Sequence, residues 1–174
     1  MQSQLSFFVS IAFSFSAWGI VAARYIWPEL RLRPRAEALR PLLMLHSFRF
    51  IGLAFLVPGV VSPGLPAAFA NSAAYGDIIA AMLALLALIS LPSTAGPNAV
   101  GMVISWIFGL WGSADLFNAF YQANRTGLTP GQLGATYFIP TFIVPLLVIT
   151  HGLAFRILLQ RQNVSGLQES RRVA

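Results

Sequence analysis

The chain has 174 residues, of which 57% are hydrophobic and 9% are charged, and its mean hydropathy is +0.73. This composition excludes an ordinary soluble domain, because a soluble helix keeps one polar face for water. The net charge of +6 would suit nucleic acid, but the arginines lie in predicted loops and tails, so we expect no nucleic-acid partner. The absence of cysteine excludes disulfides and thiolate chemistry.

Long apolar stretches recur along the chain and predict helices that cross a lipid bilayer. A helix needs about 20 apolar residues to span the hydrocarbon core. The N-terminal residues 1–4 carry no basic side chain, so we interpret the first stretch as a retained helix rather than a signal peptide. We predict an all-α, polytopic membrane bundle in one domain, residues 1–160, followed by a polar basic tail at 161–174. The expected spans, about five in number, are residues 5–27, 39–61, 73–91, 100–121 and 133–159.

Turn-forming residues separate the predicted spans. Pro58 and Gly59, followed by a Pro- and Gly-rich run at 62–66, should end the second span. The connection at 92–98 is short, so the third and fourth spans should form an antiparallel helical hairpin. The fifth span contains two prolines, at 140 and 145, and each removes a backbone donor. We therefore expect the last helix to be bent.

The arginines orient the predicted bundle. Basic residues near membrane ends are retained on the cytoplasmic side, which favours an outside N-terminus and a cytoplasmic C-terminus. Only Arg125 then lies outside, whereas a four-span arrangement would separate the basic loop from the basic tail. The use of arginine without lysine suits a GC-rich bacterial genome, so we predict the bacterial inner (cytoplasmic) membrane. The arginines placed inside are Arg24, Arg31, Arg33, Arg35, Arg40, Arg156, Arg161, Arg171 and Arg172.

Small residues at a spacing of four predict close contact between the third and fourth spans. Such spacing places them on one helix face, where another backbone can approach. The structural interpretation is therefore preferred for all of them. They are Gly101, Ser105, Gly109 and Ser113 in the fourth span and Gly76, Ala80 and Ala84 in the third.

Polar residues of the fourth span share another helix face, namely Trp111, Asp115, Asn118 and Gln122. A charged side chain at the centre of a span costs about 2.5 to 3.5 kcal/mol on insertion scales, so it should face the bundle interior and find a partner. Arg49 of the second span is the predicted partner of Asp115. Asp77 competes for Arg49, although its place near the predicted start of the third span favours an interfacial carboxylate at a helix N-terminus.

The two histidines, His46 and His151, fall within different spans. Two such imidazoles are able to ligate a haem iron axially, so haem b is an alternative cofactor, although the preferred prediction is none. Each histidine also has a hydroxyl neighbour in sequence, Ser47 or Thr150, which favours a hydrogen-bonding role. We predict no metal site in the first instance.

We expect no enzyme, because motifs such as GxSxG, HExxH and the P-loop are absent and carboxylates are few. The leading hypothesis is a membrane protein with a polar pocket between helices two, four and five, which binds or transports a small amphipathic ligand. The alternatives are an accessory subunit of a larger homo- or hetero-oligomeric complex and, third, a haem protein or an enzyme using His and Asp. The predicted ligand-binding residues are His46, Arg49, Trp111, Asp115, Asn118, Tyr137 and His151.

Overall fold

The computed structural model describes residues 2–92 and 99–160. Within these ranges the chain is helical, without a β-strand, and five helical segments are long and apolar enough to cross a membrane. The predicted helical fold with five such segments is thereby confirmed, whereas insertion and orientation stay predictions. Residues 93–98 of the predicted connection and the predicted tail at 161–174 lie outside the described residues.

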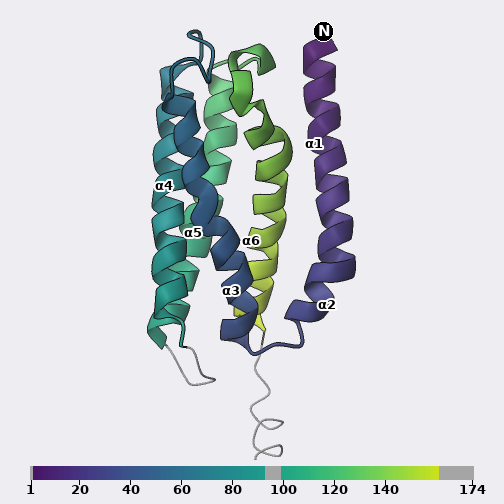
Figure 1. Ribbon diagram of the computed structural model, residues 1–174, viewed down its shortest axis with the longest axis vertical. Coiled ribbons are helices and arrows are strands. Elements are labelled where there is room, and N and C mark those ends of the chain that lie inside the picture. The colour runs from purple at the N-terminus through teal and green to yellow at the C-terminus, as the bar shows by residue number, and fades with distance from the viewer. Residues whose placement is uncertain (1, 93–98, 161–174) are drawn as a thin grey trace, which may run out of the picture.

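The five segments run alternately up and down (Figure 1). The first comprises α1 (Gln2–Val21), the π-helix η1 (Ala22–Ile26) and α2 (Trp27–Leu30). The second joins α3 (Arg35–His46) to the 3₁₀ helix η2 (Ser47–Leu56), and the third and fourth are α4 (Ala67–Ser90) and α5 (Ala99–Arg125). The fifth follows the short helix η3 (Pro130–Gln132) and consists of η4 (Gly134–Tyr137), the π-helix η5 (Ile139–Ile143) and α6 (Val144–Leu159).

The third segment begins earlier than expected. α4 starts at Ala67, directly after Pro66, instead of near residue 73. Proline fixes its own φ and is compatible with a helix start, and the Ala-rich residues that follow favour the helix. Because of this start, Asp77 lies well inside the helix and not at its N-terminus, so the interfacial role expected for Asp77 is wrong.

The second and fifth segments are not regular α-helix along their whole length. The second changes to a 3₁₀ helix at Ser47, and the fifth contains a π-helix at proline. η2 is a 3₁₀ helix of 10 residues, which is long for this conformation. η5 is a π-helix that contains Pro140, and Pro145 follows in the first turn of α6. Proline removes a backbone donor, and regular α-helix is interrupted around Pro140. The bend expected of the last helix stays a prediction.

Two apolar clusters fill the interior at its two ends. One contains Leu39, Leu43, Phe108 and Ile157, and the other contains Phe55, Phe69, Leu133 and Ile139. In each of the four inner segments a buried polar residue lies between the two clusters in sequence. These residues are Arg49, Asp77, Asp115 and His151.

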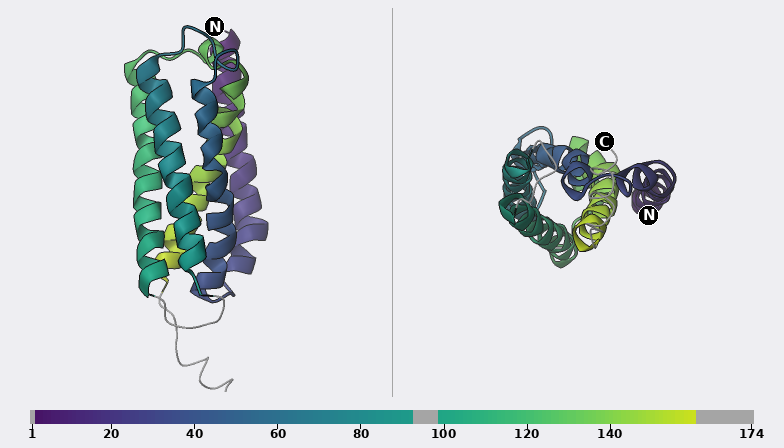
Figure 2. Two further views of the ribbon diagram at one scale, coloured as in Figure 1. Left: turned by 60° about the vertical axis from the view of Figure 1, so that its left-hand side comes forward. Right: turned by 90° about the horizontal axis from the view of Figure 1, so that it is seen from below.

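α1 lies at the edge of the bundle (Figures 1 and 2). None of its residues is buried, and it packs chiefly against η5 and α6. Trp18 meets Phe142 edge to face at a centroid distance of 5.4 Å, and Ser10 lies 3.4 Å from the hydroxyl of Tyr137. The first helix is therefore a peripheral wall and not part of the inner core.

Candidate functional site

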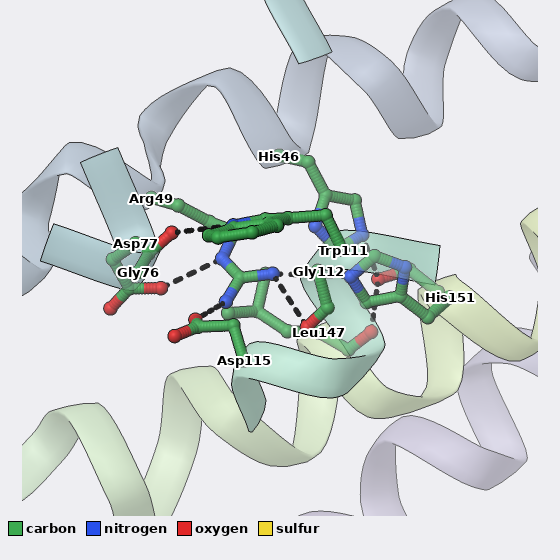
Figure 3. Close-up of polar contacts among 10 residues, drawn as sticks. His46, Arg49, Gly76, Asp77, Trp111, Gly112, Asp115, Leu147 and His151 are labelled. Carbon is green, nitrogen blue, oxygen red and sulfur yellow. Dashed lines mark hydrogen bonds and ion pairs between the residues drawn. The ribbon is translucent and has the colours of Figure 1, made fainter. Parts of the chain in front are cut away.

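Arg49 is the centre of a buried polar cluster to which four helical segments contribute (Figure 3). Only 1% of Arg49 is exposed. Its Nε donates to Asp77 Oδ1 at 2.7 Å, and its Nη2 donates to Asp115 Oδ2 at 2.6 Å. Its Nη1 donates to His151 Nε2 at 3.1 Å and lies 3.3 Å from the carbonyl oxygen of Gly112. The planar guanidinium thus connects η2 with α4, α5 and α6.

Three glycines make room for this cluster. A Cβ at Gly76 would lie 1.5 Å from Asp115 Oδ1, and a Cβ at Gly52 would lie 2.1 Å from Asp77 Oδ2. At Gly112 a Cβ would lie 2.6 Å from the His151 ring. Asp115, Asp77 and His151 therefore occupy space that is free only because the residue facing each of them is glycine.

Hydrogen-bond roles define where the histidine protons lie. Arg49 can only donate, so His151 accepts through an unprotonated Nε2 and is the neutral tautomer protonated on Nδ1. The Thr150 hydroxyl donates to the Leu146 carbonyl at 2.8 Å, so it accepts from His46 Nε2 at 2.9 Å. Both histidine Nδ1 atoms are buried without a hydrogen-bond partner among the described residues.

The arrangement of the histidines does not fit axial haem ligation by this pair. Their rings contact each other with centroids 4.2 Å apart, and Phe108 packs against both at 5.0 Å. Two axial imidazoles lie on opposite faces of a porphyrin, for which these contacting rings leave no space. In the described part of the chain, no group of three or more His, Cys, Asp or Glu residues is placed to hold a metal ion.

The cluster carries more acidic than basic groups. Arg49 supplies one positive charge, whereas Asp77 and Asp115 supply two negative charges when both are ionised. His151 is neutral and offsets neither. Asp77 Oδ2 and Asp115 Oδ1 accept no hydrogen bond from the described residues, because the only bonds to these carboxylates reach the other oxygen of each.

A cavity of about 330 Å³ adjoins the two aspartates. It lies between α1 and α5, and α4, η5, the η3 region and single residues of η2 and α6 complete its walls. Along α4 its lining ends at Asp77, and along α5 it begins at Asp115 and extends to Asn124. The aspartates therefore mark its inner end. Most of the wall is apolar, with Phe7, Phe55, Phe69, Leu116, Leu133 and Ile139 among the lining residues.

The structure brings four of the seven predicted site residues together: His46, Arg49, Asp115 and His151. The predicted ion pair between Arg49 and Asp115 is present. Asp77 also bonds the guanidinium, so Arg49 pairs with both aspartates at once.

The other three predicted residues do not bond the guanidinium. Trp111 Nε1 lies 3.4 Å from the Gly76 carbonyl oxygen, at the edge of the cluster. Asn118 donates to the Ser72 hydroxyl at 2.6 Å, and Tyr137 lies against α1 beside Phe7. Of the seven predicted residues only Asp115 lines the cavity, which differs in position from the expected pocket because α1 forms one of its walls.

Fold and site together define an all-helical protein with five membrane-compatible helices and a charged cluster at mid-bundle. The chain belongs to the family described as Domain of unknown function (DUF8737), which matches residues 6–159. No curated protein and no solved structure matches the chain.

Proposed function

We propose that the protein resides in the bacterial inner membrane and binds or transports a small amphipathic ligand in the cavity between α1 and α5. The observation that supports this most is the combination of apolar walls with two carboxylates at one end of the same cavity. Ligand sites are typically concave, mostly apolar and equipped with a few polar groups that fix orientation. The volume of about 330 Å³ is at the small end of such sites, which favours a small ligand.

The burial of charge supports a function beyond helix packing. Charged residues within membrane spans are costly, and those that occur commonly mark ligand or ion pathways. A purely structural ion pair would need one carboxylate for Arg49, but two are present. When both carboxylates are ionised, the second adds a negative charge that Arg49 does not compensate, which favours a binding site over a simple lock between helices.

The proposal is tested by filling the cavity. Ala119 lines it on α5, whereas Ala114 is an exposed residue of the same helix that does not line it. Purified protein in an uncharged maltoside detergent is heated with octanol, octylamine or octanoate, and the melting temperature is measured. We expect at least one of these probes to stabilise the wild type and the Ala114→Phe variant but not Ala119→Phe, because a ligand that binds only the folded state raises its stability.

Two results would contradict this function. If none of the three probes stabilises the wild type, the cavity is not a site for amphipathic molecules, and the accessory-subunit alternative gains. If Ala119→Phe responds to the probes as strongly as Ala114→Phe does, the ligand binds elsewhere. Folding of both variants is checked by the symmetry of their gel-filtration peaks.

A further inference from the structure

We infer that the cavity between α1 and α5 selects a cationic amphiphile, an alkylammonium head group with an apolar tail, whose charge pairs with Asp77 and Asp115. This inference rests on the proposed function and names its ligand class. It combines three observations: the charge balance around Arg49, the two carboxylate oxygens that Arg49 does not bond on side chains that line the cavity, and the apolar walls of the cavity.

The charge balance leaves one negative charge uncompensated. With both carboxylates ionised, Arg49, Asp77 and Asp115 sum to −1, from one guanidinium and two carboxylates. His151 does not offset this charge, because its Nε2 accepts from Arg49 and the ring is neutral. A single added cation would bring the cluster to neutrality, and an isolated charge inside a membrane protein is costly without such a partner.

The unpaired oxygens belong to side chains that line the cavity. Asp77 and Asp115 are each 8% exposed, so both are more than nine-tenths buried, and yet both belong to the cavity wall. Arg49 uses Asp77 Oδ1 and Asp115 Oδ2, which leaves Oδ2 and Oδ1 respectively as acceptors. An ammonium group has three donors and no acceptor, as the lysine side chain shows, so it complements two acceptor-only oxygens.

The remaining wall fits an apolar tail. Asp115 and Asn124 of α5 both line the cavity and are nine residue steps apart, or ~13 Å along the axis at 1.5 Å per residue. Phe7 of α1, Leu116 of α5 and Ile139 of η5 provide apolar surface along this length. Gln4, Asn124 and Thr129 lie at the opposite end from the aspartates. A carboxylate head group would meet like charge at the inner end, and a hydroxyl would leave the excess charge in place.

The test compares octylamine, octanol and octanoate, which share one tail and differ in head group. Each probe is titrated into purified full-length protein in an uncharged maltoside detergent at a pH where the amine is protonated, and the melting temperature is followed. We expect octylamine to reach half of its stabilising effect at a concentration about tenfold or more below that of octanol, the preference typical of a charge-assisted hydrogen bond. Octanoate should be the weakest of the three.

Two variants test the role of the carboxylates. Asp77→Asn and Asp115→Asn each remove one negative charge and leave Arg49 with one carboxylate, so each cluster is neutral and compatible with folding. Both should lose the preference for octylamine over octanol while still responding to octanol. Asn118→Ala is the control, because Asn118 lies on the same helix as Asp115 but bonds Ser72 and does not line the cavity.

The outcomes distinguish this inference from the proposed function. If octanol stabilises the wild type as strongly as octylamine does, the cavity binds amphiphiles but does not select a cation, and only the inference is overturned. The same holds if both Asn variants keep the preference for octylamine. If none of the probes acts on the wild type, the proposed function and the inference are overturned together.

Discussion

At the level of single residues, Arg49 shows how a guanidinium can be kept inside an apolar bundle. Its planar group has donors pointing in several directions, and here they meet two carboxylates, an imidazole nitrogen and a backbone carbonyl. All four contacts come from helices other than that of Arg49, namely α4, α5 and α6. The side chain therefore stabilises the relative positions of η2, α4, α5 and α6 together.

Removal of Arg49 should destabilise the protein far more than removal of one carboxylate. Arg49→Leu leaves two buried carboxylates without a cation, and breaking a buried pair in this way typically costs ~3 to 5 kcal/mol. Asp115→Asn leaves a neutral pair of Arg49 with Asp77, so its cost should be about 1 to 3 kcal/mol, that of a weakened buried hydrogen bond. The measurement is the melting temperature of each purified variant in detergent.

Two further variants make this prediction specific. Arg125→Leu removes an exposed arginine from the last turn of α5 and should have little effect. Combining Arg49→Leu with Asp77→Asn and Asp115→Asn removes every charge and should restore much of the loss. If the triple variant is no more stable than Arg49→Leu, buried charge is not the cause of the destabilisation.

The sequence was sufficient to predict the partner of Asp115 but not the role of Asp77. Both judgements used the same rule, that a charge inside a span needs a counter-charge. The sequence pattern predicts a helix start near residue 73, whereas α4 begins at Ala67, and a difference of a few residues moves the Asp77 side chain from the interface to the interior. The predicted spans contain two aspartates and a single arginine, Arg49, near mid-depth, and this count indicates that both aspartates share it.

At the level of helices, glycine positions decide which faces can meet. α4 and α5 pack closely at two glycines. Gly76 of α4 faces the Asp115 side chain, and an ideal Cβ on Gly101 of α5 would lie 2.9 Å from the carbonyl oxygen of Ser90. Of the predicted small residues, Gly76 thus faces the Asp115 carboxylate, and an ideal Cβ on Gly109 of α5 would lie 3.2 Å from Phe155 of α6, so these glycines do not show the two predicted small-residue faces meeting each other. The sequence pattern could not show that Gly76 also accommodates a carboxylate, because spacing defines a face and not the side chain that it receives.

A methyl group at Gly76 should disrupt the polar cluster. In Gly76→Ala the new Cβ would coincide with the Asp115 carboxylate, so Asp115 must move away from Arg49 at a cost of about 1 to 3 kcal/mol. Gly152→Ala is the matched control, since it lies in α6 with no atom within 4 Å of an ideal Cβ and should gain up to ~1 kcal/mol from helix propensity. Melting temperatures of both variants provide the test, and equal effects would contradict the close contact.

α1 is the element whose role sequence reasoning did not foresee. Its apolar composition predicted a span, and a helix of that length is present, but the expected pocket did not include it. Periodicity reports which face of a helix is apolar, but in α1 large apolar side chains occur around the whole helix with serines between them, so the apolar pattern does not single out the side that faces the cavity. Phe7 and Ile11 were thus outside the candidate set.

At the level of the whole molecule, the described arginines outside the bundle interior gather at one end, with the exception of Arg125 at the end of α5. Arg24 lies in η1, Arg35 and Arg40 lie in the first half of α3, and Arg156 lies in the last turn of α6. These parts of the chain are at the lower end in Figure 1, opposite the N-terminus. Arg40 bonds the carbonyl oxygens of Leu91 and Pro92, and Arg156 lies 3.9 Å above the Trp27 ring.

This gathering leads to a prediction of orientation. Because basic residues are retained in the cytoplasm, a reporter fused at the C-terminus should lie in the cytoplasm and one fused at the N-terminus should lie outside. An enzyme that is active only in the periplasm and a fluorescent protein that matures only in the cytoplasm give opposite readouts at the two sites. Termini on the same side would contradict five crossings.

The charge dependence of the orientation can be tested in the same assay. Replacing Arg31, Arg33 and Arg35 by glutamine removes much of the basic end, so a fraction of the chains should insert with the C-terminal reporter outside. Arg125→Gln is the matched control at the opposite end and should leave the orientation unchanged or more uniform, because it removes the arginine that opposes the bias. If the triple variant keeps a uniform orientation, the arginines do not determine it, and the direction must come from the helices themselves.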